Sequence, residues 1–133
     1  MSAIDLFGTT FQNPILLAAG TAGFGRELDD VIDLDLLGGI VTKAVTPEPR
    51  QGHAALRVAE FRGGMLNAVG LANPGVERVA AYELPWLSQR LARARIIVTV
   101  AGATATLRKC PRVGRRSHSI NVGADTPISR ARR

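Results

Sequence analysis

The stretch 63–75, GGMLNAVGLANPG, is the part of the sequence best suited to hold a ligand. Its glycines allow a positive φ and a close approach of the backbone to another molecule. Asn67 and Asn73 each add an amide that can donate and accept hydrogen bonds at once. A stiff, apolar loop that carries amides suits a flat polar heterocycle, and a purely structural tight loop is the competing interpretation.

Lys43 is a second candidate, because it ends the apolar run that begins at Gly39. In α/β barrels, the active site is built at the carboxyl ends of the strands. An ammonium group there could hold a carboxylate or stabilise negative charge that develops during a reaction. The alternative is a lysine that only extends from a strand end into solvent.

Short apolar segments separated by turn signals predict alternating strands and helices. We expect a hairpin over 4–11, strands over 15–19, 39–43 and 95–101, helices over 27–37 and 76–91, a loop over 46–57, and a second hairpin formed by 58–61 and 65–66. Gly38 and Gly39 are expected to end the first helix, and Pro85 to interrupt the second. The predicted fold class is α/β with a parallel sheet.

The stretch 63–75 resembles the substrate loop of the dihydroorotate dehydrogenases, which are flavin enzymes of pyrimidine biosynthesis. The segments 13–27, 38–50 and 84–102 are also similar to this family, in its order and spacing. Met65 and Leu66 ahead of Asn67 look most like the class 1B enzymes. The resemblance covers residues 1–102 and implies the N-terminal part of a (β/α)8 TIM barrel, with about three βα units after a hairpin. A whole barrel needs about 250 residues, so we expect a truncated one.

The resemblance also implies which residues form the site. The expected FMN contacts are Ala19, Gly20, Thr21, Lys43 and Ala44, and the expected substrate contacts are Lys43, Asn67, Ala68, Val69, Gly70 and Leu71. The family commonly has serine at the position of Ala19 and asparagine at that of Thr99, and Ala44 could equally be ordinary strand-end packing. Asn73 is expected to tie down the loop or cap the next helix.

By resemblance, the enzyme oxidises dihydroorotate to orotate, with proton loss from C5 and hydride transfer from C6 to FMN. Electrons would then reach NAD through a partner subunit that carries FAD and an iron–sulfur cluster, in a heterotetramer. The class 1 base is a cysteine, but the neighbours of Cys110 do not match its loop, so no catalytic residue is assigned. His53 and His118 receive no role, and no metal site is expected. We expect the purified chain to bind no FMN and to be inactive; a yellow, stoichiometric flavoprotein with turnover would contradict this.

The basic charge of the chain lies in residues 103–133, which we expect to be a disordered tail behind a partial barrel domain over 1–102. Residues 1–102 hold nine Lys or Arg and ten Asp or Glu, whereas residues 103–133 hold eight Lys or Arg and only Asp125. One interpretation is a shifted reading frame or an incorrect gene model near residue 102. The other is a non-catalytic module whose tail binds nucleic acid, which is disfavoured because no aromatic residue interleaves the basic ones.

The remaining composition indicates a cytoplasmic protein. A single cysteine allows no internal disulfide and no cysteine-built zinc cluster. The N-terminus lacks a basic start followed by an apolar core, and no apolar run approaches the roughly 20 residues of a membrane helix.

The frameshift interpretation predicts that genomic DNA downstream of the Gly102 codon encodes the rest of the barrel in another frame. Sequencing that region and translating all three frames tests it. If no frame continues the barrel, the frameshift interpretation is wrong.

Overall fold

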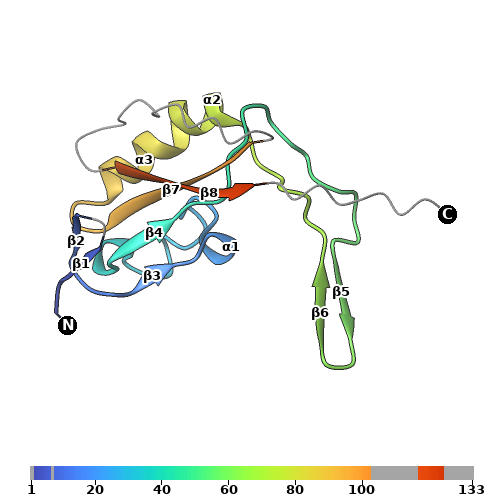
Figure 1. Cartoon of the computed structure of the whole chain (residues 1–133), viewed down its shortest axis with the longest axis horizontal. Coiled ribbons are helices and arrows are strands. Elements are labelled where there is room, and N and C mark those ends of the chain that lie inside the picture. The colour runs from blue at the N-terminus through green and yellow to red at the C-terminus, as the bar shows by residue number, and fades with distance from the viewer. Residues whose placement is uncertain (1, 7, 103–116, 125–133) are drawn as a thin grey trace.

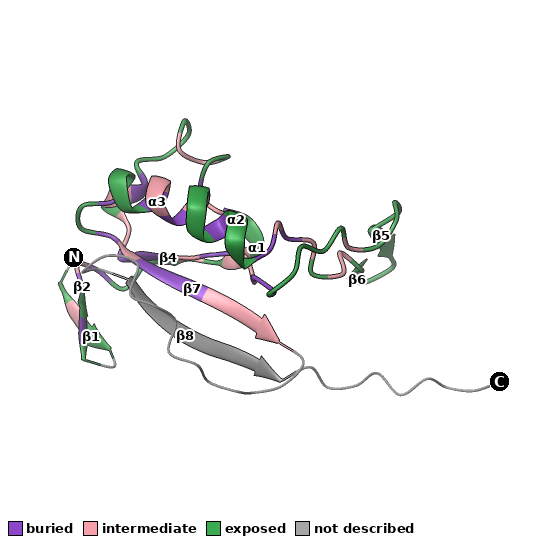
Figure 2. Cartoon of the chain, turned by 90° about the horizontal axis from the view of Figure 1, so that it is seen from above, coloured by how far each residue is buried: buried purple, intermediate pink, exposed green. Residues whose placement is uncertain are grey.

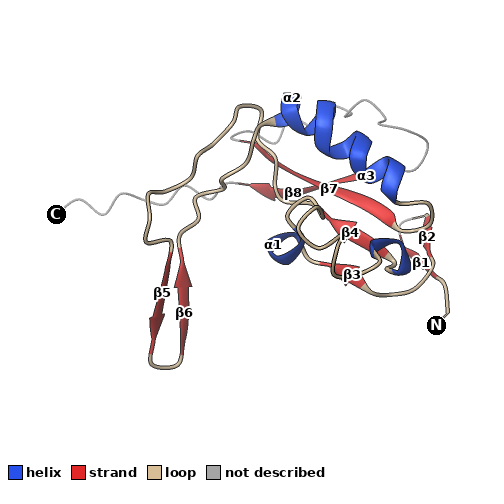
Figure 3. Ribbon diagram, turned by 180° about the vertical axis from the view of Figure 1, so that it is seen from behind, coloured by secondary structure: helices blue, strands red, loops and turns tan. Residues whose placement is uncertain are grey.

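The computed structural model describes residues 2–6, 8–102 and 117–124, and Figure 1 shows their arrangement. An antiparallel hairpin of β1 (Ile4–Leu6) and β2 (Thr9–Phe11) opens the chain. A parallel sheet follows, with the strand order β3 (Leu16–Leu17), β4 (Gly39–Val41), β7 (Arg95–Gly102) and β8 (Ser117–Ala124). A second antiparallel hairpin, β5 (Val58–Phe61) and β6 (Gly64–Asn67), extends away from this sheet (Figures 1 and 3).

The helical elements lie between these strands. They are α1 (Ala19–Ala22), the 3-10 turn η1 (Leu34–Leu36), α2 (Val76–Arg78), the π-helical turn η2 (Val79–Glu83) and α3 (Leu84–Arg90). The last three form one continuous helical segment that covers a face of the sheet (Figure 3). The π turn ends just before Pro85, which lacks an N–H and cannot complete a regular helical ladder. None of the helices in the described residues is long and apolar enough to cross a bilayer.

The hydrophobic core lies between the helical segment and the sheet. Ile40 and Leu87, at 0% exposure, face this core from β4 and α3, and Ile96 and Val98 add to it from β7. Figure 2 shows the buried residues concentrated on β4, the first part of β7 and the inner side of α3. Burial of each such side chain contributes about 1.5–3 kcal/mol, so this layer holds the central strands in place.

β4 fits between β3 and β7 because it begins at two glycines. A Cβ on Gly38 would lie 2.0 Å from the carbonyl oxygen of Asn13, and one on Gly39 would lie 2.7 Å from that of Arg95. Gly39 is in register with Leu16 on one side and Arg95 on the other. The three strands therefore end at the same edge of the sheet, which is the geometry expected for a βα barrel site.

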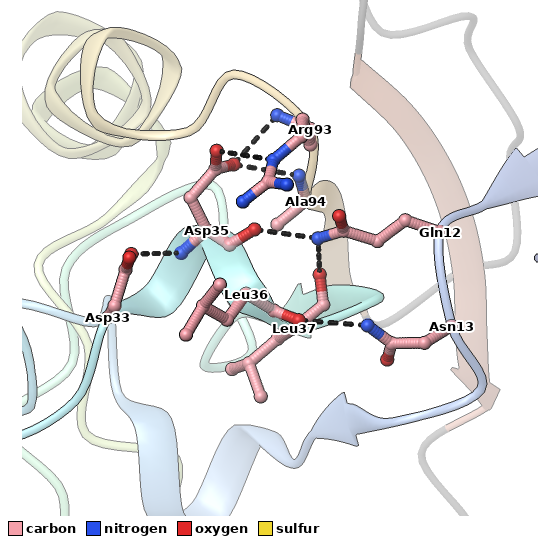
Figure 4. Close-up of polar contacts among 8 residues, drawn as sticks. All are labelled: Gln12, Asn13, Asp33, Asp35, Leu36, Leu37, Arg93 and Ala94. Carbon is pink, nitrogen blue, oxygen red and sulfur yellow. Dashed lines mark hydrogen bonds and ion pairs between the residues drawn. The ribbon is translucent and has the colours of Figure 1, made fainter. Parts of the chain in front are cut away.

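The helix expected over 27–37 was wrong: this segment forms turns followed by η1, and Gly38 and Gly39 lead into β4, which begins at Gly39, instead of capping a helix. Side chains take over the backbone groups that a helix would pair internally (Figure 4). Gln12 donates to the carbonyls of Asp35 and Leu37, and Asn13 donates to that of Leu36. Asp33 accepts from the Asp35 N–H, as aspartate commonly does outside helices.

Most other expected elements are confirmed, with shifted boundaries. Both hairpins, the strands at 39–43 and 95–101, the loop over 46–57 and the parallel α/β class agree with the structure. The strand expected over 15–19 is reduced to β3, and α1 follows it at once. No strand was expected after residue 102, yet β8 pairs in parallel with β7. Residues 103–116 and 125–133 of the expected tail lie outside the described part.

Asp35, in η1, forms hydrogen bonds with the loop before β7. Its carboxylate accepts from the backbone N–H groups of Arg93 (2.7 Å) and Ala94 (2.9 Å) and from Nε of Arg93 (3.3 Å). Burial raises the pKa of Asp35, but the bonds from Ala94 and Arg93 outweigh it and leave the pKa below its usual value. A carboxyl whose pKa is depressed by folding stabilises the protein above its unfolded pKa and loses this effect in acid.

We predict that Asp35→Ala destabilises the chain by about 1–3 kcal/mol at pH 7, because two backbone donors lose their acceptor. The wild type should lose this advantage as the pH falls below about 4, so the two unfolding curves should converge there. Urea unfolding at several pH values measures both effects, with the exposed Asp30→Ala as control. Equal stabilities of the Asp35→Ala and Asp30→Ala variants at pH 7 would contradict the prediction.

Candidate functional site

A cavity of about 740 Å³ lies at the edge of the sheet where β3 and β4 end. Its lining residues come from three parts of the chain: Ala19, Gly20 and Gly23 around α1, Lys43 and Ala44 after β4, and Val58, Met65, Asn67, Ala68, Val69, Gly70 and Leu71 from the hairpin and the loop after it. A volume of this size is within the range of small-molecule sites.

Lys43 is positioned at this cavity by its own backbone. Its N–H donates to the carbonyl of Gly23 (2.8 Å), and its carbonyl accepts from the hydroxyl of the fully buried Thr42 (3.2 Å). The Thr42 hydroxyl oxygen also accepts from the N–H of Thr99 on β7 (3.3 Å). Both peptide groups beside Lys43 are therefore fixed, and its side chain is half-buried.

The turn that contains Gly23 is held against the helical layer by Arg26. The Arg26 guanidinium lies 4.5 Å from the centre of the Trp86 ring and pairs with Glu83 at 2.7 Å. A cation over an aromatic face and an exposed ion pair each contribute modestly. Together they link the wall of the cavity that contains Gly23 to the start of α3.

The hairpin presents one of its two faces to the cavity. Val58 pairs with Asn67, and Glu60 with Met65, so these four residues share a face. Three of them, Val58, Met65 and Asn67, line the cavity. The opposite face carries Phe61 and Leu66, which are exposed.

The segment Asn67–Leu71 is braced by the loop before β5. His53 Nδ1 lies 3.0 Å from the Ala68 carbonyl, and the His53 N–H donates to Val69 (3.2 Å). Because a carbonyl can only accept, Nδ1 must carry the proton in this contact. Arg57 donates from Nε to the His53 carbonyl (2.6 Å), and its own carbonyl accepts from the Ala68 N–H (2.7 Å).

Gly70 allows the two loops to lie this close. Its φ is +74°, and a Cβ there would lie 2.9 Å from the backbone nitrogen of His53. A larger residue would push the loops apart and would also be strained at this φ.

Several polar groups of this cavity have no partner within the described part of the chain. They are the Lys43 ammonium, the Asn67 side-chain amide and the backbone N–H groups of Val69, Gly70 and Leu71. Donors without a partner on residues that border an apolar cavity can bind a planar ligand with carbonyl or carboxylate oxygens. The described residues contain no group of three or more His, Cys, Asp or Glu that could hold a metal ion.

The structure brings together all the predicted site residues except Thr21. Thr21 lies within α1, is exposed, and does not line the cavity. Thr99 is half-buried on β7 and does not line it either. Cys110 lies outside the described residues, and His118 falls on β8, where only the backbone is described. Asn73 ties down the loop, as expected, whereas the N-cap of α2 is Gly75.

No pattern along the chain indicated the bracing role of His53. A single histidine in a loop has no periodicity, and its partners are 15 and 16 residues away along the chain. Arg57 was missed for the same reason, because its contacts join two loops that only the fold brings together.

We predict that His53→Ala loosens the segment 67–71, since one loop-to-loop hydrogen bond is lost. A net loss of about 1 kcal/mol corresponds to roughly five-fold faster local amide exchange. Hydrogen–deuterium exchange of the peptide that spans these residues measures the effect. Gln51→Ala is the matched control, because Gln51 contacts Arg57 only through its backbone carbonyl. Equal exchange rates in the two variants would show that His53 does not brace the loop.

Comparisons with known proteins agree with this arrangement. The family model described as dihydroorotate dehydrogenase matches residues 1–124. The chain is 50% identical over 114 residues to "Dihydroorotate dehydrogenase B (NAD(+)), catalytic subunit" of Listeria welshimeri, which covers 84% of this chain and 37% of that protein. Proteins of the same name match it in Latilactobacillus sakei, at 44% identity over 93% of this chain and 42% of the relative, and in Cutibacterium acnes, at 50% over 77% and 33%.

These matches agree with the expected truncation, and they extend the matched region beyond the sequence motifs. The chain spans only about 37% of the length of the Listeria relative. The matched region extends to residue 124, beyond the boundary at residue 102 that the sequence motifs suggested, and so includes β8. With a family model that covers most of its length, the chain belongs to the dihydroorotate dehydrogenase family.

Proposed function

We propose that the cavity is the part of a dihydroorotate dehydrogenase site that faces both flavin and pyrimidine. The enzyme would be of the B type and would oxidise dihydroorotate to orotate. The observation that carries this proposal is the convergence of Lys43 and the segment Asn67–Leu71 on one cavity at the carboxyl ends of parallel strands. These groups are separated by more than 20 residues of sequence, yet they line a single space.

The chemistry of the cavity suits orotate and its dihydro form. Both carry ring carbonyls, ring N–H groups and a carboxylate, so they need donors, an acceptor and a cation. The Asn67 amide supplies a donor and an acceptor, and the amides of Val69, Gly70 and Leu71 supply donors. The Lys43 ammonium can pair with a carboxylate and stabilise negative charge on a neighbouring ring.

The residues on the opposite wall fit a flavin ring. Ala19, Gly20, Gly23 and Ala44 have small side chains or none, and a Cβ added at Gly20 would meet no atom within 4 Å. Such a wall allows a planar ring to lie against the backbone. Lys43 is the only cation among the described lining residues, so these residues fit the ring of FMN better than its phosphate.

FMN, when bound, would supply the hydride acceptor for carbon C6 of the substrate. The residues of this chain would hold the substrate ring in the orientation that this transfer requires. Lys43 is also the only titratable side chain among the described lining residues, and as an ammonium it cannot take the C5 proton. The proton acceptor would therefore come from outside the described lining, as expected from the missing base cysteine.

We further propose that electrons leave through a partner subunit that carries FAD and an iron–sulfur cluster and reduces NAD. The support is the shared name of the relatives, which calls each a catalytic subunit of an NAD(+) enzyme. A cytoplasmic location is part of the same proposal.

A chimera tests the proposed function. Residues 1–102 of this chain would replace the matching segment of the Listeria welshimeri subunit, produced together with its partner subunit. We predict dihydroorotate-dependent reduction of NAD.

Two substitutions in this chimera test the roles of single residues. Lys43→Ala should lower kcat/KM by roughly 100-fold or more. Asn67→Ala should raise the KM for dihydroorotate about ten-fold, as expected for the loss of one or two hydrogen bonds.

Arg78→Ala is the matched control, because it removes an exposed cation from α2, which does not line the cavity. A folded chimera that binds FMN but shows no turnover would contradict the proposal. Equal effects of Lys43→Ala and Arg78→Ala would contradict the role of Lys43.

A further inference from the structure

Leu71 has an unusual backbone conformation for its residue type. Its φ is +55°, and it is the only residue other than glycine with a positive φ in the described part of the chain. A branched, L-configured side chain in this region costs roughly 1–2 kcal/mol, and such strain persists only where the surroundings impose it.

The side chain of Asn73 contacts the backbone of Leu71 and of two other residues. Asn73 is 7% exposed, and its Nδ2 donates to the Leu71 carbonyl (2.7 Å) and to the Thr46 hydroxyl oxygen (2.9 Å). Its Oδ1 accepts from the backbone N–H groups of Thr46 (3.1 Å) and Gly75 (3.0 Å). All four hydrogen-bonding positions of the amide are thus in use, and the neighbours fix which end is oxygen and which is nitrogen.

The anchor for Asn73 is itself well held. The Thr46 hydroxyl donates to the Glu48 carbonyl (2.6 Å), which leaves its oxygen free to accept from Asn73. The backbones of Asn73 and Arg50 also exchange a pair of hydrogen bonds of 2.9 Å each. Asn73 is therefore held through both its side chain and its backbone.

Leu71 lines two cavities. One is the 740 Å³ cavity, and the other is a cavity of about 420 Å³ lined also by Thr46, Pro47, Glu48, Pro49, Arg50, Ala101 and Gly102. Glycine would adopt this φ without strain but would bring no apolar side chain to either cavity. A leucine at this position combines a strained backbone with an apolar lining.

We propose that Asn73 is a positioning residue for the substrate site. It holds Leu71 in the left-handed region, so that the Leu71 side chain closes the wall of the larger cavity and its N–H points with those of Val69 and Gly70 toward the pyrimidine. The role of this orientation in substrate binding rests on the proposed function, whereas the conformational link between Asn73 and Leu71 does not.

The conformational link is tested by NMR on the full-length chain without ligand. Leu71 should show the strong intraresidue amide-to-Hα NOE that a positive φ produces. In Asn73→Ala and in the isosteric Asn73→Asp, which loses both donors, this NOE should fall to that of Leu56. A folded variant of either kind that keeps the strong NOE would overturn the proposal, and so would loss of the whole fold, because only the loop should be released.

A pair of substitutions at residue 71 gives a second, independent measurement. Leu71→Gly should be more stable than Leu71→Ala, by at least about two-fold in the unfolding constant, since only alanine is strained at this φ. The order should reverse at the exposed Leu56, and also at residue 71 in the Asn73→Ala background. The same order at residue 71 with and without Asn73 would contradict the assigned role.

Titration of the labelled chain with millimolar orotate then tests whether the link between Asn73 and Leu71 contributes to substrate binding. We expect shifts at the amides of Val69, Gly70 and Leu71, and at least about five-fold weaker binding in Asn73→Ala, which adds no charge; this is equivalent to one lost hydrogen bond. Equal affinities would overturn the positioning role. Absence of any shift in the wild type, with the NOE results as predicted, would count against the proposed function and not against the link between Asn73 and Leu71.

Discussion

The arrangement of the molecule depends on the close packing of β4 between β3 and β7. Gly38 and Gly39 have no side chains where the carbonyls of Asn13 and Arg95 approach. Because β4 packs between β3 and β7, it is in register with both of them, and its carboxyl end lies beside theirs. Lys43 reaches the cavity because it lies two residues after this strand. A side chain at either glycine would therefore disturb the site as well as the sheet.

The two ends of the sheet satisfy their polar groups in different ways. At the amino ends of the strands, Gln12, Asn13 and Asp35 pair with backbone groups of neighbouring segments, so the protein itself supplies the partners (Figure 4). At the carboxyl ends, Lys43 and Asn67 have no such partners among the described residues. This division agrees with the general rule that one end of a βα barrel provides stability and the other binds ligands.

Patterns of local sequence predicted the elements that depend on local interactions. Both hairpins, β4 and β7 could be identified, because glycine turns and apolar runs are contiguous. Most of the residues that line the cavity were expected from the family resemblance and not from local patterns. The helix expected over 27–37 failed, since the decisive contacts come from Gln12, Asn13 and Arg93, which are distant in sequence. The left-handed conformation of Leu71 had no sequence signal either, because the contacts of Asn73 with the Leu71 carbonyl and with Thr46 form only in the folded chain.

The central claim is that Lys43 and the Asn67–Leu71 segment line one cavity at the end of β4, in which the pyrimidine binds. A crystal structure of the chain soaked with orotate tests this claim most directly. The account predicts orotate in the larger cavity, with its polar atoms between the Lys43 ammonium and the Asn67 amide. Orotate bound only beside Glu48 and Arg50 in the smaller cavity, or Lys43 and Asn67 on separate faces of the molecule, would contradict it.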